Sequence, residues 1–84
     1  MAYTRKDFGL ELKEKIKKGE AQDAIGEWAY AMYYEHMLEI DDDFQDFLTD
    51  LNAMEGGPEF ARSYEELDQI ADRLIAGENV KLYP

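Results

Sequence analysis

The chain has no cysteine, a single histidine and a single serine. Without cysteine it can form neither disulfide bonds nor a thiolate zinc site. A Ser/His/Asp triad would need His36 to reach Ser63, which is predicted to cap a helix, so that chemistry is not expected. His36 shares a helix face with Trp28 and Met32, and we expect it to be a partly buried core residue. The chain lacks an apolar run of about 20 residues and starts with the polar segment 1–6, so we expect a soluble, cytoplasmic protein.

Positive charge is also scarce. Nine Lys and Arg residues stand against twenty Asp and Glu residues, which gives a net charge of −11 over 84 residues. A nucleic-acid binder gains affinity by neutralising phosphates with cations, so this composition excludes a conventional one, and it also disfavours binding to an anionic membrane surface. The charge is unevenly distributed, with +3 on residues 1–19 and −14 on residues 20–84. We therefore expect a basic first helix on an acidic body.

Apolar residues are nevertheless plentiful. They make up 45% of the chain, and aromatic residues make up 13%. A disordered acidic tail would contain few aromatics, so this composition favours a folded protein. The length corresponds to one domain over residues 1–84, and the aromatics supply the dense core that so small a domain needs.

Helical periodicity recurs along most of the sequence. Phe8, Leu12 and Ile16 are spaced by four residues behind a capping Thr4, and Ser63-Tyr64-Glu65-Glu66 is a capping box that marks a clear helix start. Glycines follow several of the periodic segments and predict where these helices end. We expect four helices, at about 5–18, 21–38, 42–55 and 63–76.

The connections between these segments are short, which favours antiparallel neighbours. The stop after the third segment is strong, because Gly56-Gly57-Pro58 cannot continue a helix. The tail 78–84 is too short for a hairpin, and we expect it to lie on the helices as an extended strap. The sequence thus predicts an all-α protein, a compact four-helix bundle with short loops and a C-terminal strap.

Three aspartates repeat along the third predicted helix. Asp42, Asp46 and Asp50 are spaced by four residues, on the face opposite the apolar positions Phe44 and Leu48. Like charges at this spacing destabilise a helix by a few tenths of a kcal/mol per pair. The helix dipole accounts for Asp42 but not for Asp50, which lies well along the helix. The stripe is either a solvated face that maintains solubility or a docking surface for a cationic partner.

Tyrosines are concentrated on the second predicted helix. Tyr30, Tyr33 and Tyr34 cannot all face one small core if Trp28 and Met32 do. Tyrosine is enriched at the centres of protein interfaces, because it combines a large area with a polar tip. Either this helix is central and covered on every side, or its tyrosines lie at an interface with another protein or a second copy.

Two pairs of acids have a spacing that a magnesium site uses. Glu11-Leu12-Lys13-Glu14 reads E-x-x-E, and Glu39-Ile40-Asp41-Asp42 reads E-x-x-D. Two carboxylates three residues apart on a helix can converge on a hard cation, which prefers oxygen ligands. In this order the eight residues resemble the magnesium-binding pattern of small all-α nucleotide pyrophosphohydrolases. The resemblance implies a metal-dependent hydrolase whose ligands are Glu11, Glu14, Glu39 and Asp42.

The leading hypothesis is a small acidic, non-enzymatic interaction protein without a cofactor. It would bind a basic protein partner, or associate with itself, through Asp42, Asp46, Asp50, Tyr30, Tyr33 and Tyr34. Toxin-neutralising immunity proteins and nucleic-acid mimics share this composition, because their targets present cationic clefts. The alternatives are the metal-dependent nucleotide hydrolase and a structural subunit or homo-oligomer. Direct binding to nucleic acid or to a membrane is not expected.

Overall fold

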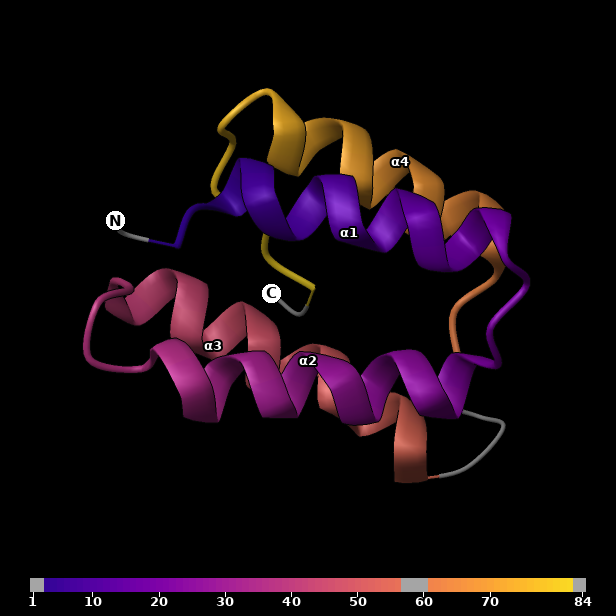
Figure 1. Cartoon of the computed structure of the whole chain (residues 1–84), viewed down its shortest axis with the longest axis horizontal. Helices are drawn as coiled ribbons and strands as arrows, with labels where there is room; N and C mark the ends of the chain where they lie inside the picture. Colours follow the sequence, from indigo (N-terminus) through magenta and orange to yellow (C-terminus); the bar gives the residue numbers. More distant parts are fainter. Residues whose placement is uncertain (1–2, 57–60, 83–84) are drawn as a thin grey trace.

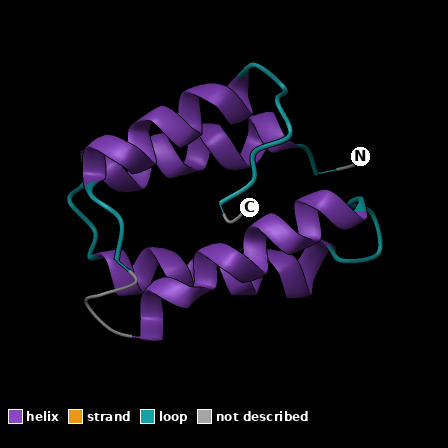
Figure 2. Ribbon diagram, turned by 180° about the vertical axis from the view of Figure 1, so that it is seen from behind, coloured by secondary structure: helices purple, strands orange, loops and turns teal. Residues whose placement is uncertain are grey.

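Local sequence signals set the helix ends. The computed structural model describes residues 3–56 and 61–82, and this part of the chain is helical and contains no strand (Figures 1 and 2). The all-α prediction is confirmed. The helices are α1 (Arg5–Lys17), α2 (Gln22–His36), α3 (Asp42–Leu51), the short 3₁₀ helix η1 (Asn52–Gly56) and α4 (Tyr64–Ile75).

Two helices begin with the predicted caps. The Thr4 hydroxyl accepts a hydrogen bond from the Asp7 amide at 3.1 Å, and the Asp7 carboxylate accepts one from the Thr4 amide at 3.0 Å. The Ser63 hydroxyl accepts a hydrogen bond from the Glu66 amide at 3.1 Å at the start of α4, which is one half of the predicted capping box; the Glu66 carboxylate pairs with Arg62 instead of returning to the Ser63 amide. These bonds satisfy amides that have no partner inside the helix. After the C-terminal ends of α1 and α4, Gly19 and Gly77 adopt φ of 70° and 86°, a left-handed conformation that residues with a Cβ rarely adopt.

The predicted boundaries differ from the structure by one residue at several helix ends and by more than that in two places. The second helix ends at His36 rather than at 38, and the predicted helix 42–55 is α-helical only to Leu51 before it tightens into η1. The change at Leu51 coincides with close packing against α2. A Cβ on Gly26 would lie 3.3 Å from both the Leu51 carbonyl and the Met54 Cβ. The last two residues of the predicted stop, positions 57 and 58, lie outside the described residues.

The helices form two antiparallel pairs that pack as two layers (Figure 1). One layer is α1 with α4, and the other is α2 with α3 and η1. Gly9 permits the close approach of α1 to α4, because a Cβ there would lie 2.9 Å from the Ala71 carbonyl and 2.9 Å from the Ile75 Cγ1. Successive helices run in opposite directions, as the short connections predict.

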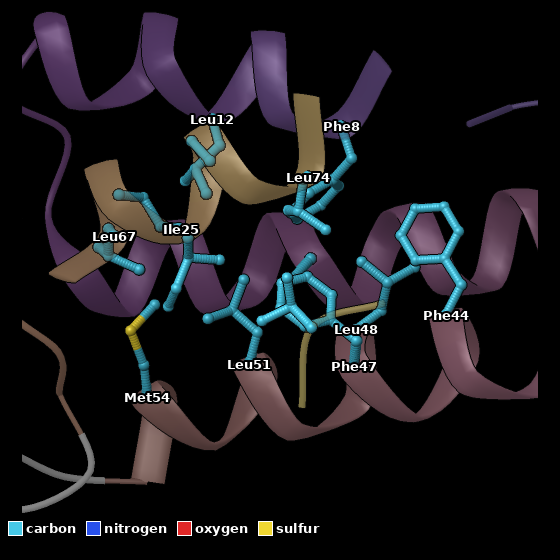
Figure 3. Packing of buried hydrophobic residues seen from close by; sticks show 14 of the residues in the cluster. Phe8, Leu12, Ile25, Phe44, Phe47, Leu48, Leu51, Met54, Leu67 and Leu74 are labelled. Atoms are coloured by element: carbon cyan, nitrogen blue, oxygen red, sulfur yellow. The ribbon is translucent and has the colours of Figure 1, made fainter. Parts of the chain in front are cut away.

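The core lies between the two layers and is apolar (Figure 3). The Phe8 ring is fully buried and stacks on Trp28, with 4.3 Å between ring centroids. Phe47 approaches Phe8 edge-on. Among the described residues no polar or charged residue is buried. The aliphatic part of the buried core comprises Leu12, Ile25, Ala29, Ile40, Leu48, Leu51, Leu67, Ile70, Ala71, Leu74 and Val80.

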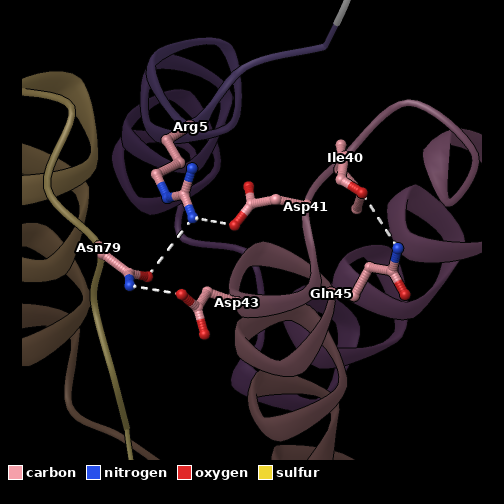
Figure 4. A network of polar contacts seen from close by, with 6 residues as sticks. All are labelled: Arg5, Ile40, Asp41, Asp43, Gln45 and Asn79. Carbon is pink, nitrogen blue, oxygen red and sulfur yellow. Dashed lines mark hydrogen bonds and ion pairs between the residues drawn. The ribbon is translucent and has the colours of Figure 1, made fainter.

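A polar clamp closes one end of the bundle (Figure 4). The Arg5 Nη2 donates to the Asp41 carboxylate at 2.9 Å and to the Asn79 Oδ1 at 3.4 Å, and the guanidinium lies 5.1 Å from the centroid of the Phe44 ring. The Asn79 amide in turn donates to the Asp43 carboxylate at 2.9 Å. The clamp thus joins α1, the start of α3 and the tail, where Val80 is buried.

Asp41, at the N-terminal end of α3, binds Arg5 instead of capping the helix. It occupies the cap position of α3, but its side chain forms no capping hydrogen bond there. The hydrogen bond from Arg5 lowers the pKa of the Asp41 carboxyl below its ordinary value. The turn before α3 is held by Gln45, whose Nε2 donates to the Met37 and Ile40 carbonyls at 2.9 and 3.0 Å.

Gly9→Ala tests the contact between α1 and α4. Alanine is the better helix former by about 1 kcal/mol, so propensity alone predicts a gain in stability. The added Cβ would instead meet backbone and side-chain atoms of α4, and such overpacking costs about 1–3 kcal/mol. We expect a lower free energy of unfolding in urea denaturation. The neighbouring exposed substitution Leu10→Ala should change it by less than about 0.5 kcal/mol. A rise in stability for Gly9→Ala would contradict the close approach.

Candidate protein-binding face

Lysine and arginine are absent from the middle of the chain. No lysine or arginine occurs between Gly19 and Ala61, which is the whole segment that forms α2, α3 and η1. The α2–α3 layer therefore presents carboxylates without any Lys or Arg of its own. The basic residues belong to α1, α4 and the segments that flank them.

The predicted aspartate stripe lies on the outer side of this layer. Asp42 and Asp46 are exposed, and neither forms an ion pair within residues 3–56 and 61–82. Asp46 lies about half a turn around α3 from the buried Phe44, so it points away from the other layer. Solvent is the immediate environment of both carboxylates.

Asp50, the third member of the stripe, lies in an environment that disfavours its negative charge. It is half-buried, and burial raises the pKa of its carboxyl above the ordinary value. The negative charge of Asp46 raises this pKa further, whereas the positive charge of Arg62 lowers it. The net effect is a raised pKa, which means that the folded protein disfavours the ionised form of Asp50.

Several carboxylates elsewhere in the fold have cation partners within the chain. The Lys13 Nζ lies 3.1 Å from the Asp68 carboxylate and 2.6 Å from the Asp72 carboxylate, and these hydrogen bonds raise the pKa of Lys13. Arg62 pairs with Glu66 at 3.4 Å, and Arg5 pairs with Asp41. The Lys13 pairs hold α1 to α4, the Arg5–Asp41 pair closes one end of the bundle, and the Arg62–Glu66 pair is local to the start of α4. Asp42 and Asp46 have no such cation partner within the described residues, a property that they share with other exposed acids such as Glu35.

The tyrosines divide between the two roles that the sequence left open. Tyr33 is half-buried and packs against the core. Tyr30 is 42% exposed and Tyr34 is 68% exposed. The centroid of the Tyr30 ring lies 5.9 Å from that of Tyr33 and 5.9 Å from that of Tyr34, so the three rings form one cluster. Two of its members are available to another molecule.

Tyrosines and aspartates share one side of the molecule. Tyr34 lies about half a turn around α2 from the buried Ile25, just as Asp46 lies opposite Phe44 on α3. The two helices run antiparallel, with Gly26 against Leu51 at one end and the Gln45 side chain on the Met37 carbonyl at the other. The tyrosine turn of α2 therefore lies alongside the middle of α3. We call this surface the outer face, formed by Tyr30, Tyr34, Asp42 and Asp46 with Tyr33 and Asp50 at its half-buried margins.

Leu38 is the residue of this region that the sequence prediction missed. Its side chain is 99% exposed, and the neighbouring Met37 is 36% exposed. The prediction placed both residues inside the second helix, whereas the helix ends at His36 and the chain turns there. The turn is stabilised by hydrogen bonds from Gln45, a contact that hydrophobic periodicity does not reveal.

The four carboxylates of the magnesium pattern are placed separately. Glu11 and Glu14 are exposed on α1, and Asp42 begins α3. Glu39 lies between helices and accepts hydrogen bonds from the Tyr3 amide and the His36 Nδ1, both at 2.8 Å, and these bonds lower its pKa. Within the described part of the chain no group of three or more His, Asp and Glu side chains is arranged to hold a metal ion.

His36 is partly buried, as predicted. Its ring stacks on the Tyr3 ring with 4.0 Å between centroids, and Glu39 holds its Nδ1. The Tyr3 hydroxyl is buried. Burial raises the pKa of the Tyr3 phenol, and the charges of Glu11 and Asp7 raise it further. The His36 imidazole is thus part of the packing that joins the N-terminus to the end of α2.

Similarity to other proteins provides no functional assignment. Comparison with protein-family models, with curated proteins and with solved structures found no match to this chain. No helix in residues 3–56 or 61–82 is both long enough and apolar enough to cross a membrane. Function is therefore inferred from the surface chemistry of the chain.

Asp50→Asn tests the electrostatic cost of the stripe. Because the pKa of Asp50 is raised in the folded state, its ionised carboxylate opposes folding at neutral pH, and this effect is lost once both states are protonated. We expect the variant to gain a few tenths of a kcal/mol in urea denaturation near pH 7 and to match the parent near pH 3.

Asp42→Asn is the matched control. It removes the same charge from the first turn of α3, where the helix dipole favours an anion, so we expect a small loss of stability rather than a gain. If both variants shifted the free energy of unfolding in the same direction near pH 7, the inference that the fold disfavours a charge at Asp50 and favours one at Asp42 would be wrong.

Proposed function

We propose that this chain is a small acidic, non-enzymatic protein that binds a basic partner protein through its outer face. The observation that carries the proposal is the combination on one side of the molecule of exposed tyrosines with aspartates that have no internal cation partner. A solvated face that served only solubility would not need exposed aromatic rings beside its charges. The combination is typical of a surface that another protein covers.

The two residue types make different contributions to binding. The α2–α3 layer has no Lys or Arg, so its negative potential attracts a cationic surface over distances comparable to the Debye length, about 8 Å at physiological salt. This attraction accelerates association. The tyrosines act after contact, because burying their rings and bonding their hydroxyls slows dissociation.

Charge favours a different protein over a second copy in this position. A symmetric dimer through the outer face would place Asp42 and Asp46 of one chain against the same residues of the other. Like charges across an interface suppress such pairing. A partner with a cationic cleft has the opposite potential, and for this reason we propose an inhibitor or immunity-type role for the chain.

The triple variant Asp42→Asn/Asp46→Asn/Asp50→Asn tests the proposal. The chain and the variant serve as baits in extracts of the native host, and captured proteins are quantified by mass spectrometry. We expect the parent to enrich one or more basic proteins and the variant to lose most of that enrichment. With the purified partner, the association rate should fall about tenfold or more at low salt, and much less at high salt.

The control has the same net charge but leaves the outer face intact. Glu11→Gln/Glu14→Gln/Glu65→Gln removes three exposed charges from α1 and α4. Under the proposal this variant captures the same proteins as the parent. Equal capture by the parent and the aspartate variant would refute the assignment of the outer face, and equal losses in both variants would reduce the effect to net charge.

A further inference from the structure

A hollow lies where α2 ends, next to the outer face. It has an open volume of about 220 Å³ and is lined by Tyr34, Glu35, His36, Met37, Leu38 and Glu39. The exposed Leu38 and Met37 give it an apolar wall. Because the Leu38 side chain is almost fully exposed, it adds no burial energy to the folding of the free protein. It would contribute to a binding free energy only when another molecule covers it.

The polar groups around the hollow are acceptors. Glu35 is exposed and forms no ion pair within the described residues, and Glu39 carries a lowered pKa that keeps it ionised. The C-terminal end of α2 adds the negative end of its helix dipole. His36 is the one basic side chain in the lining, and its Nδ1 is engaged by Glu39. A group that fills the hollow therefore has to be positively charged and partly apolar.

We propose that the hollow receives a single arginine or lysine side chain of the basic partner. The alkyl stem packs on Leu38 and Met37, and the charged end lies near the carboxylates of Glu35 and Glu39. Tyr34, at the rim, offers its ring to the same cation. This inference rests on the proposed function, which supplies the basic partner, and adds the chemistry by which that partner is anchored.

Other occupants fit the hollow less well. An apolar side chain would leave the carboxylates buried without a counter-charge, which is costly. A metal ion would gain nothing from the leucine and methionine wall, because hard cations require oxygen ligands on several sides. A long side chain with an apolar stem and a cationic end matches both parts of the lining.

A peptide titration tests the proposal. The probe is a short soluble peptide that carries arginines, and its control has citrulline at each arginine position, which keeps the shape and removes the charge. Binding to the full chain is followed by backbone amide NMR shifts. We expect the arginine peptide to shift the amides of residues 34–39 most strongly, and the citrulline peptide to leave them unchanged.

Two matched pairs of variants separate this site from general electrostatics. Glu35→Gln and Glu27→Gln each remove one exposed charge from α2, and only Glu35 lines the hollow. Leu38→Ser and Leu10→Ser each remove an exposed leucine, and Leu10 lies on α1. We expect Glu35→Gln and Leu38→Ser to weaken peptide binding about fivefold each, the equivalent of about 1 kcal/mol, and the two controls to weaken it less than about twofold.

The outcomes distinguish the anchor from the proposed function. If Glu35→Gln and Glu27→Gln weakened peptide binding equally, or if Leu38→Ser did not weaken it, the anchor would be overturned. The proposal that the outer face captures a basic partner would be unaffected by that result. If the aspartate variant and the Leu38→Ser variant both captured the same proteins as the parent, the proposed function and the anchor would both be overturned. Sedimentation of the chain alone as a dimer that depends on Leu38 would overturn the anchor in favour of a second copy.

Discussion

A single apolar layer between two helix pairs keeps the charged side chains of residues 3–56 and 61–82 at the surface. Phe8, Ile25, Phe44 and Leu48 fill that layer, and no polar or charged residue in the described chain is buried with them. Ionised side chains must therefore point outward or lie at the margins, because burial without a partner would cost several kcal/mol. In a domain of this size each helix contributes one face to the core and the opposite face to the surface. The spacing that buries the apolar side chains therefore also fixes which charged side chains share an outer face.

Two of the chain's few cations hold separate elements together. Arg5 closes one end of the bundle, and Lys13 connects α1 to two carboxylates of α4. Such exposed pairs are individually weak, about 0–1 kcal/mol; the Lys13 pairs act within the α1–α4 layer, whereas the Arg5 pair connects the two layers. The α2–α3 layer has no Lys or Arg of its own and is reached only from outside it, by Arg5 at Asp41, by Lys15 over the Trp28 ring and by the charge of Arg62 near Asp50, among the described residues. Its negative potential is thus a consequence of how the cations are distributed along the sequence.

Sequence periodicity was sufficient for the parts of the fold that depend on local order. The spacing of Phe8 and Leu12 and the capping residues Thr4 and Ser63 predicted the helices and the core-facing sides of the chain. The spacing of the aspartates also predicted that Asp42 and Asp46 would share an exposed face. These properties follow from the geometry of one helix at a time.

Features that depend on contacts between helices were not predictable in this way. The switch to η1 occurs where Gly26 receives the backbone of Leu51, and the early end of α2 is held by Gln45 from another helix. The exposure of Leu38 follows from that turn. The aspartate stripe lies on α3 and Leu38 follows the end of α2, so the two features on which the proposed binding rests lie on separate elements. Under the proposed function, attraction by the stripe and anchoring at the hollow arise on different elements, and a double-mutant cycle between Asp46 and Leu38 measures the coupling between them.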